Sequence, residues 1–539
     1  MFRTSVSPKG QFLVALHRPS CSVANLRKQD LVSVLGHTDD GTPCDNRVNF
    51  PQRDIHVSAA KWIYEIPNAF PFRGTTYIDS EWAKSRAADP ASIALLPPTP
   101  DCSLRNALSK YLDNHQVTEI IADLPIWILY GLAANSTDPE ELVQLAHTCC
   151  RIEHNAAGEP VGLRHVQDGQ GKLRPDIDDL ELFETIANNV ALPDSYKEVM
   201  VLKPGIQGTS EIVGEWYTPQ SHVFEYMRSN SYIPWGHFAS NMADDTVRYR
   251  TADLTADDMQ GLRHLYYQRM YLTLAEKVGI DNPVRRRNLT VDELEELRLK
   301  IISAINDDTE QVATLWGWNF GYDFSPSGYR LHASHQMIHH QYAMVPEKVA
   351  TEDGTEKIPA YSCGDLVADV VERYHKATGS DFFDDLLAAI RNNIRTDRRD
   401  GEKSLVVWKD ENVVLFVPKA QVSQWELQLM VKADSPQGPV GNVFEADSLT
   451  RRSIDRGILF AQHIYAGLNA KMVTSVEFPK RVGMRNGQRL LYSFLPKLPW
   501  AMGGFSEAHL RFICGHFPED FATCCRLQIK KLTDNKKIS

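Results

Sequence analysis

Alternating apolar and polar positions, bounded by proline and glycine, recur along the C-terminal two-thirds of the chain. Runs rich in β-branched and aromatic residues with these boundaries predict strands. They occur at 197–204, 210–217, 313–322, 331–346, 404–419 (two strands around Asp410-Glu411-Asn412), 425–433, 473–482 and 488–498. Between the last two, the Asn486-Gly487 dipeptide favours a hairpin. Residues 154–172 are polar and contain glycine, so they predict a loop.

Helix start signals fall between these strands. Thr255 is followed three residues later by Asp258, and Thr290 by Glu293, and both pairs resemble capping boxes. They predict one helix from about Thr255 to Gly279 and another beginning near residue 291. Apolar periodicity predicts further helices at about 141–151, 364–377, 381–393 and 447–470.

The order strand, strand, helix, strand, strand occurs twice in this pattern. It predicts an α+β protein with two similar halves behind an N-terminal extension. We place the extension, whose fold is unclear from the sequence, at 1–190, the first half at 191–350 and the second half at 351–539. A chain of 539 residues is long enough for two to four such units.

Charge and composition exclude several classes of protein. Lys and Arg number 58 and Asp and Glu 69, so the net charge of −11 leaves no basic excess for coating nucleic acid. The sequence contains no stretch of about 18 uncharged apolar residues, so it predicts no membrane-spanning helix. The apolar run at 12–16 is too short for a secretory signal. Nine cysteines without a C-x-x-C pattern favour reduced thiols, and we expect a cytoplasmic protein. The glycine patterns of P-loop and Rossmann proteins, and G-x-S-x-G, are absent.

The most informative run is YRLHASHQMIHHQYAMVP at 329–346, which holds four of the eighteen histidines. On a strand, residues two apart share a face, so His339 and Gln341 would lie side by side. A neutral imidazole can attack phosphorus and split one difficult transfer into two easier steps. A neighbouring amide can donate a hydrogen bond to a phosphate oxygen as charge develops there. The pattern therefore favours phosphoryl or nucleotidyl chemistry.

This run resembles the active-site motif of the galactose-1-phosphate uridylyltransferase branch of the histidine-triad (HIT) superfamily. Ser334, His339, Gln341 and Pro346 match the motif, and Asn319-Phe320-Gly321 is similar to the Asn-x-Gly turn of the family. Residues 503–522 look like its closing segment. The resemblance covers about 195–350 well and 400–525 loosely. It implies two HIT-like halves, each an antiparallel sheet with packed helices.

The resemblance also implies roles for individual residues. His339 would be the nucleophile that carries the nucleotidyl group, and Gln341 would bind the phosphates. Ser334, His335, Arg330 and Asn319 are the expected substrate-binding residues. The histidine that ligates metal in zinc-containing relatives is Met337 here, and their C-x-x-C is missing, so we expect no structural zinc. Whether a divalent cation accompanies the nucleotide is left open.

The expected activity is ping-pong nucleotidyl transfer from a nucleoside-diphosphate compound, such as a nucleotide sugar, to a phosphate-bearing acceptor. Two alternatives remain open. One is a phosphorylase or hydrolase of dinucleoside polyphosphates, nucleotide sugars or adenylyl sulfate, and the other is a non-catalytic nucleotide-binding protein, suggested by Met337. The expected partners are a nucleotide and its acceptor, with no nucleic acid and no membrane. Relatives are often homodimers, and a homodimer is expected here by that analogy alone.

Overall fold

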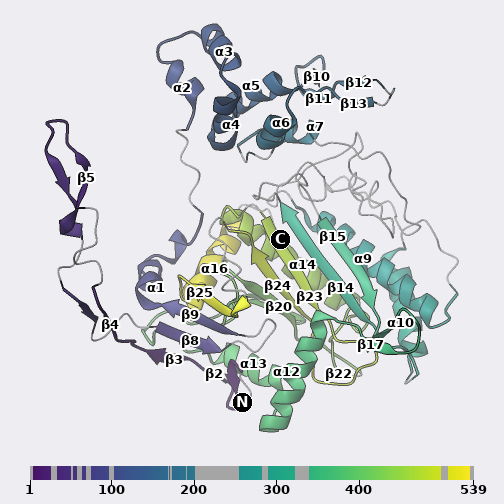
Figure 1. Ribbon diagram of the computed structural model, residues 1–539. Coiled ribbons are helices and arrows are strands. Elements are labelled where there is room, and N and C mark those ends of the chain that lie inside the picture. The colour runs from purple at the N-terminus through teal and green to yellow at the C-terminus, as the bar shows by residue number, and fades with distance from the viewer. Residues whose placement is uncertain are drawn as a thin grey trace.

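The computed structural model describes residues 4–25, 33–49, 53–57, 63–67, 74–95, 102–200, 254–281, 289–321, 339–498 and 508–534, apart from positions 168, 170, 172, 188, 190, 307, 437 and 471. The fold is α+β, as the sequence predicted. A broad antiparallel sheet with helices on both faces forms its centre (Figure 1).

Seven of the described strands form this central sheet in the order β15-β14-β23-β24-β20-β19-β18, and every neighbouring pair is antiparallel. The strands are β14 (Ala313–Gly321), β15 (His339–Val345), β18 (Val406–Lys409), β19 (Val413–Phe416), β20 (Leu427–Val431), β23 (Met472–Phe478) and β24 (Leu491–Pro496). Six of them lie within a run that the sequence predicted as strand, and β23 begins one residue before its predicted run. Because β14 pairs with β23, strands assigned to the first and second halves share one continuous sheet. The proposed domain boundaries stay a prediction.

One face of the sheet is covered by long helices. These are α9 (Ala256–Lys277), α10 (Val291–Ala304), α14 (Ser448–Gly467) and α16 (Pro518–Asp534). Their apolar sides and the facing strand residues form the largest hydrophobic cluster. Both predicted capping boxes are present. The hydroxyls of Thr255 and Thr290 accept a hydrogen bond from the backbone N–H three residues further on, and their own backbone N–H donates to the carboxylate of that residue. Each box satisfies backbone groups that a helix end leaves without an intrahelical partner.

A buried ionic network joins these helices to the sheet. The Arg263 side chain of α9 is fully buried and lies 3.1 Å from Asp455 of α14. Glu477 of β23 accepts hydrogen bonds from the hydroxyls of Tyr266 and Tyr492, each at 2.6 Å. Four aromatic rings surround the guanidinium at 4.6–5.2 Å. These partners offset the free-energy cost of removing the Arg263 charge from water.

The opposite face of the sheet is covered in part by α12 (Cys363–Thr378) and α13 (Phe382–Arg391). A hairpin from the start of the chain, β1 (Val6–Ser7) with β2 (Gln11–Phe12), packs on α13. Gly364 permits a close approach of α12 to the chain after β23, because a Cβ there would lie 1.8 Å from the carbonyl oxygen of Pro479. Both helices fall where the sequence predicted them.

The first 95 residues build onto the C-terminal part of the chain. Four described strands form a second sheet in the order β25-β9-β8-β3, in which β25 and β9 are parallel. They are β3 (Ala15–His17), β8 (Ile63–Pro67), β9 (Thr75–Asp79) and β25 (Arg511–Cys514), and α1 (Ser80–Ala87) follows β9. Two-stranded ladders continue the β3–β8 ribbon: β4 (Cys21–Val23) with β7 (Ile55–Val57), and β5 (Val34–His37) with β6 (Pro43–Asp45) (Figure 1).

Residues 102–200 form a unit with its own hydrophobic cluster. Its helices are α2 (Leu104–Leu108), α3 (Asn114–Ala122), α4 (Ile126–Asn135), α5 (Pro139–Cys149), α6 (Leu180–Ala187) and α7 (Asp194–Val199). Its strands are β10 (Ile152–His154), β11 (Pro160–Leu163), β12 (His165–Gln167) and β13 (Leu173–Pro175). The N-terminal extension predicted at 1–190 therefore consists of two parts. The first 95 residues pack on the C-terminal part of the chain, and residues 102–200 form their own hydrophobic cluster.

Two predictions for this unit are wrong. Residues 154–172, expected as a loop, contain the whole of β11 and β12, which belong to two antiparallel ladders. Residues 197–199, expected to start a strand, close helix α7, whose first turn follows Pro193. A proline directly before a helix is a common start, because its fixed φ suits the first turn. The predicted strand at 210–217 lies outside the described residues.

Shorter elements complete the described chain: β16 (Lys348–Ala350) with β17 (Lys357–Pro359), and β21 (Asp434–Ser435) with β22 (Gly438–Pro439). The predicted β23–β24 hairpin is present, but residues 479–490 connect the strands, so Asn486-Gly487 is not a two-residue turn. Within the described ranges no single helix has the length and hydropathy to cross a membrane. Only α3 and α4 taken together, with a bend of 116° between them, reach that length and composition.

Candidate active site

The candidate nucleophile lies on β15, which pairs along its whole length with β14. The backbone of His339 is directly opposite Asn319, that of Gln341 is opposite Gly317, and that of Tyr342 is opposite Trp316. Residues 339–345 are therefore in a strand, as predicted, and not in a helix.

Alternation along β15 separates its residues into two faces. Tyr342 and Met344 pack against the large cluster beneath α9, and the ring of Tyr342 lies 6.0 Å from that of Tyr266. On β14, Trp316 and Trp318 are buried in the same cluster. Positions 339 and 341 have the opposite parity, which they share with the exposed Ala343. The register thus assigns 339 and 341 to the face of the strand away from α9.

The other sheet residues on that face are only partly covered near β15. Leu315 of β14 is 41% exposed, although it lies in the middle of a sheet strand. Thr474 and Val476 of β23 are half-buried, and they pair with Asn319 and Gly317. A large apolar side chain in the middle of a strand is normally buried. The described residues therefore leave the sheet face away from α9 partly exposed near β15.

Further across the same face lies a buried carboxyl group that the sequence analysis did not single out. Glu426 precedes β20, and its carboxylate accepts hydrogen bonds from the Gln428 amide at 2.8 Å, the Val422 backbone N–H at 2.8 Å and the Ser493 hydroxyl at 3.3 Å. Complete burial raises the pKa of Glu426 to about 7, and the three hydrogen bonds oppose the rise. The signal was present in Glu426-Leu427-Gln428, where two polar residues share one face of an apolar strand.

Position in the sheet separates Glu426 from the candidate nucleophile. Gln341, Gly317, Val476, Ser493 and Gln428 form one cross-strand row. The row crosses four strand spacings of about 4.8 Å each, or roughly 19 Å. A general acid has to lie within hydrogen-bonding reach of the proton that it transfers. Glu426 is therefore too distant to act on atoms bonded to residue 339.

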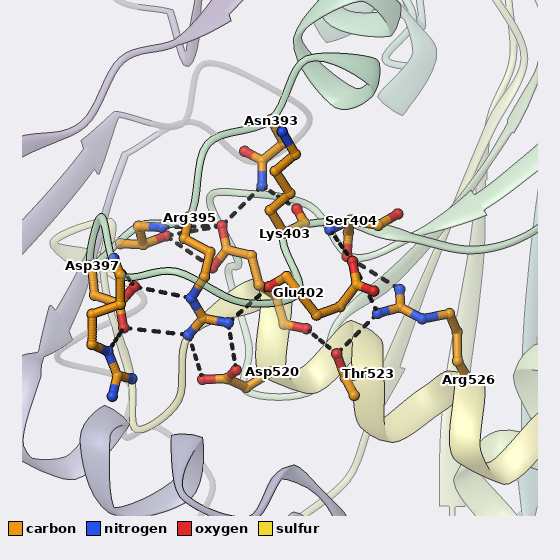
Figure 2. A network of polar contacts seen from close by, with 12 residues as sticks. Asn393, Arg395, Asp397, Glu402, Lys403, Ser404, Asp520, Thr523 and Arg526 are labelled. Carbon is orange, nitrogen blue, oxygen red and sulfur yellow. Dashed lines mark hydrogen bonds and ion pairs between the residues drawn. The ribbon is translucent and has the colours of Figure 1, made fainter.

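A second buried polar network holds the loop that follows α13. Lys419 forms an ion pair with Glu519 at the start of α16, and its Nζ also donates to Asn393 Oδ1 at 3.1 Å. Arg395 donates to both carboxylate oxygens of Asp520, at 2.8 and 3.1 Å, and to Asp397 at 3.0 Å (Figure 2). Burial lowers the pKa of Lys419, and the charge of Glu519 opposes this. Lys419 and Arg395 are paired with Glu519 and Asp520, so the network joins the loop after α13 to the start of α16.

The structure describes the predicted site residues to different extents. It brings the backbones of His339 and Asn319 together and places Gln341 two residues further along the same strand. Ser334, His335 and Arg330 lie outside the described residues, as does Met337. Among the residues that the structure describes, no group of three His, Cys, Asp or Glu side chains converges on one point. The assigned roles of these residues stay predictions.

Comparison with known proteins gives structural matches. No family model matches the sequence, and no curated protein matches it. The chain is similar to an ADP-glucose phosphorylase from Arabidopsis thaliana with bound ADP-glucose, with 14% identity over 52% of this chain and 70% of that chain and a TM-score of 0.34. It is also similar to a GalT-like protein from Arabidopsis thaliana, with 14% identity, 52% and 72% coverage and a TM-score of 0.34. A uridylyltransferase matches with 11% identity, 45% and 69% coverage and a TM-score of 0.30.

Proposed function

We propose that this chain is a nucleotidyltransferase that acts on a nucleotide sugar or a similar nucleoside-diphosphate compound through His339. The observation that carries the proposal is the strand at 339–345, on which the two motif positions, 339 and 341, share the face that α9 does not cover. A histidine and a glutamine two apart on a strand face can act on one phosphate group. The Ser334-x4-His339-x-Gln341 spacing supports the same chemistry.

The proposed reaction has two balanced steps. The imidazole of His339 attacks the α-phosphorus, an N–P bond forms, and the bond from that phosphorus to the bridging oxygen breaks, which releases the sugar phosphate. A phosphate oxygen of the acceptor then attacks the same phosphorus, the N–P bond breaks, and the imidazole is regenerated. Gln341 would donate a hydrogen bond to a phosphate oxygen as charge develops there.

The pairing of Asn319 with His339 supports a positioning role for the neighbouring strand. β14 is hydrogen-bonded on both sides, to β15 and to β23, so its backbone is held at two edges. An edge strand attached to such a neighbour is fixed over the paired length. A reacting group on that strand then needs little reorganisation before attack. Asn319, Arg330, Ser334 and His335 would contribute contacts to the nucleotide or its phosphates.

The test is to trap the intermediate. The full chain is incubated with nucleotide sugars labelled in the α-phosphate, then quenched in base, and the protein-bound label is measured. We expect label that is stable in base and lost in acid, as a phosphoramidate is. His339→Ala should carry no label, whereas His340→Ala, the adjacent position on the other face, should keep it. Label retained in His339→Ala contradicts the proposal.

The acceptor is identified by chasing the labelled protein. Sugar 1-phosphate as the effective acceptor makes the chain a transferase, inorganic phosphate makes it a phosphorylase, and water makes it a hydrolase. Each reaction is repeated with a chelator, which tests whether a divalent cation accompanies the nucleotide. Tight nucleotide binding without label or turnover, retained in His339→Asn, would instead indicate a non-catalytic nucleotide-binding protein.

A further inference from the structure

Two histidines and a tyrosine converge in the unit formed by residues 102–200, outside the segment proposed to carry out the reaction. His147 lies in the last turn of α5, His154 ends β10, and Tyr196 belongs to α7. The hydroxyl oxygen of Tyr196 lies 3.4 Å from Nε2 of His147 and 3.5 Å from Nε2 of His154. Both imidazoles therefore direct the same nitrogen toward one point.

The spacing of the two rings matches that of a shared metal ion. Their centroids are 5.3 Å apart and their planes differ by 31°. A metal–nitrogen bond of about 2.0–2.1 Å puts each ring centre about 3.2 Å from the metal, so a tetrahedral angle separates the two centres by about 5 Å. The rings thus need little movement to bind one ion.

Hydrogen bonding explains the arrangement less well. A hydroxyl group carries a single proton, so it can donate to one imidazole and accept from the other. Such a relay is favourable at donor–acceptor distances near 2.7–3.2 Å. Both distances to the Tyr196 hydroxyl are longer than that range. As hydrogen bonds the two contacts are weak, which leaves room for an ion between the three atoms.

The cluster lies at the surface of the unit. Both histidines are exposed to solvent, which gives an ion a route to them. A tyrosine hydroxyl is a less favoured donor for these ions than an imidazole nitrogen, so Tyr196 would be the weakest of the three ligands.

We propose that His147 and His154, together with the Tyr196 hydroxyl, bind one divalent transition-metal ion of the Co²⁺, Ni²⁺, Cu²⁺ or Zn²⁺ class. Imidazole nitrogen is a preferred donor for these ions, and water would complete the coordination. The ion would join the end of α5 to β10 and α7, three elements that are separate in the sequence. Because it binds the folded unit, it would stabilise that unit in proportion to its concentration.

Cobalt titration of the full chain tests the proposal. Tetrahedral Co²⁺ with nitrogen and oxygen ligands absorbs in the visible region, and thiolate ligands add a near-ultraviolet band that would reveal binding to cysteine instead. We expect one bound equivalent without the thiolate band, more than about tenfold weaker binding in His147→Ala and in His154→Ala, and a smaller loss in Tyr196→Phe. His115→Ala, which removes an exposed histidine on α3 of the same unit, is the matched control and should bind as the wild type does.

A second measurement distinguishes the loss of the metal site from the loss of folding. The far-ultraviolet circular dichroism of each variant is compared with that of the wild type, and the melting temperature is measured with and without Zn²⁺. We expect Zn²⁺ to raise the melting temperature of the wild type and of His115→Ala but not of the His147→Ala/His154→Ala double variant. Equal binding by the folded double variant, a thiolate band, or no binding by the wild type overturns the proposal.

Discussion

Asn319 and His339 are opposed backbone partners in the antiparallel β14–β15 ladder, and Asn319 is at the same time paired with Thr474 of β23. The two residues are adjacent in space although residues 322–338 separate their strands in the sequence. The pairing fixes the register of the strand that carries the candidate nucleophile. A shift of one residue would move position 339 to the face packed against α9.

The register makes different predictions for two histidines of the motif. His339→Ala should reduce nucleotidyl transfer by about a thousandfold or more, because no other group would form the covalent intermediate. His335→Ala should cost less, since this residue is expected to contact the substrate only. Steady-state rates and circular dichroism of both variants check this. Equal losses in the two variants would mean that the motif has been assigned in the wrong register.

Glu426 predicts a dependence of stability on pH. Its pKa of about 7 in the folded chain lies above the ordinary value of 4.5. Between these two values the folded chain keeps a proton that the unfolded chain has lost, so the free energy of unfolding falls as pH rises through this window. The loss is complete above pH 7 and amounts to about 3 kcal/mol.

Urea unfolding at pH 5 and pH 8 measures this effect by comparing the wild type with Glu426→Gln. The amide has no charge to bury, so the variant should gain stability relative to the wild type as pH rises. Burial also raises the pKa of Asp455, to about 6, but Asp455 titrates in both proteins and cancels in the difference. A difference that is the same at both pH values would show that Glu426 titrates normally in the folded chain.

Lys419 is predicted to be critical for stability. Lys419→Met leaves the buried carboxylate of Glu519 without its cation and should lower the free energy of unfolding by about 3–5 kcal/mol. Lys376→Ala is the control, because Lys376 pairs with Glu372 on the exposed surface of α12, and it should cost less than about 1 kcal/mol. Denaturant unfolding checks both values, and similar small losses would contradict the importance given to burial.

Gly364 predicts a steric effect with a matched control. Gly364→Ala should destabilise the chain by about 1–3 kcal/mol or more, because the new Cβ would overlap the carbonyl oxygen of Pro479. Gly131→Ala in α4 meets no atom within 4 Å and should gain up to about 1 kcal/mol from the higher helix propensity of alanine. Thermal unfolding of the two variants should therefore shift in opposite directions.

Local signals allowed much of the fold to be predicted from the sequence. The capping boxes at Thr255 and Thr290 depend on residues three apart, so they are visible in a single window. The strands of the central sheet were recognisable because their β-branched and aromatic residues occur in short bounded runs. Residues 197–199 were predicted wrongly. The β-forming residues of that run begin at Val199, whereas Lys197 and Glu198 suit the helix that starts after Pro193.

Long-range pairings could not be predicted in the same way. Nothing near Thr75 indicates that β9 pairs with β25, and nothing near Ala313 indicates that β14 lies between β15 and β23. The same limit applies to the site. The motif identified His339 and Gln341 through their spacing, whereas the meeting of His147, His154 and Tyr196 depends on how three separate elements pack.

The parallel pairing of β9 with β25 has a consequence for synthesis on the ribosome. Cys514 is the partner of Ile78, so the edge of β9 has no neighbouring strand there until the chain has been translated as far as residue 514. Until then that edge exposes backbone groups that could join a strand from another nascent chain. A chaperone that shields residues 75–79 during elongation would oppose such pairing, and chains truncated before residue 511 should aggregate more readily.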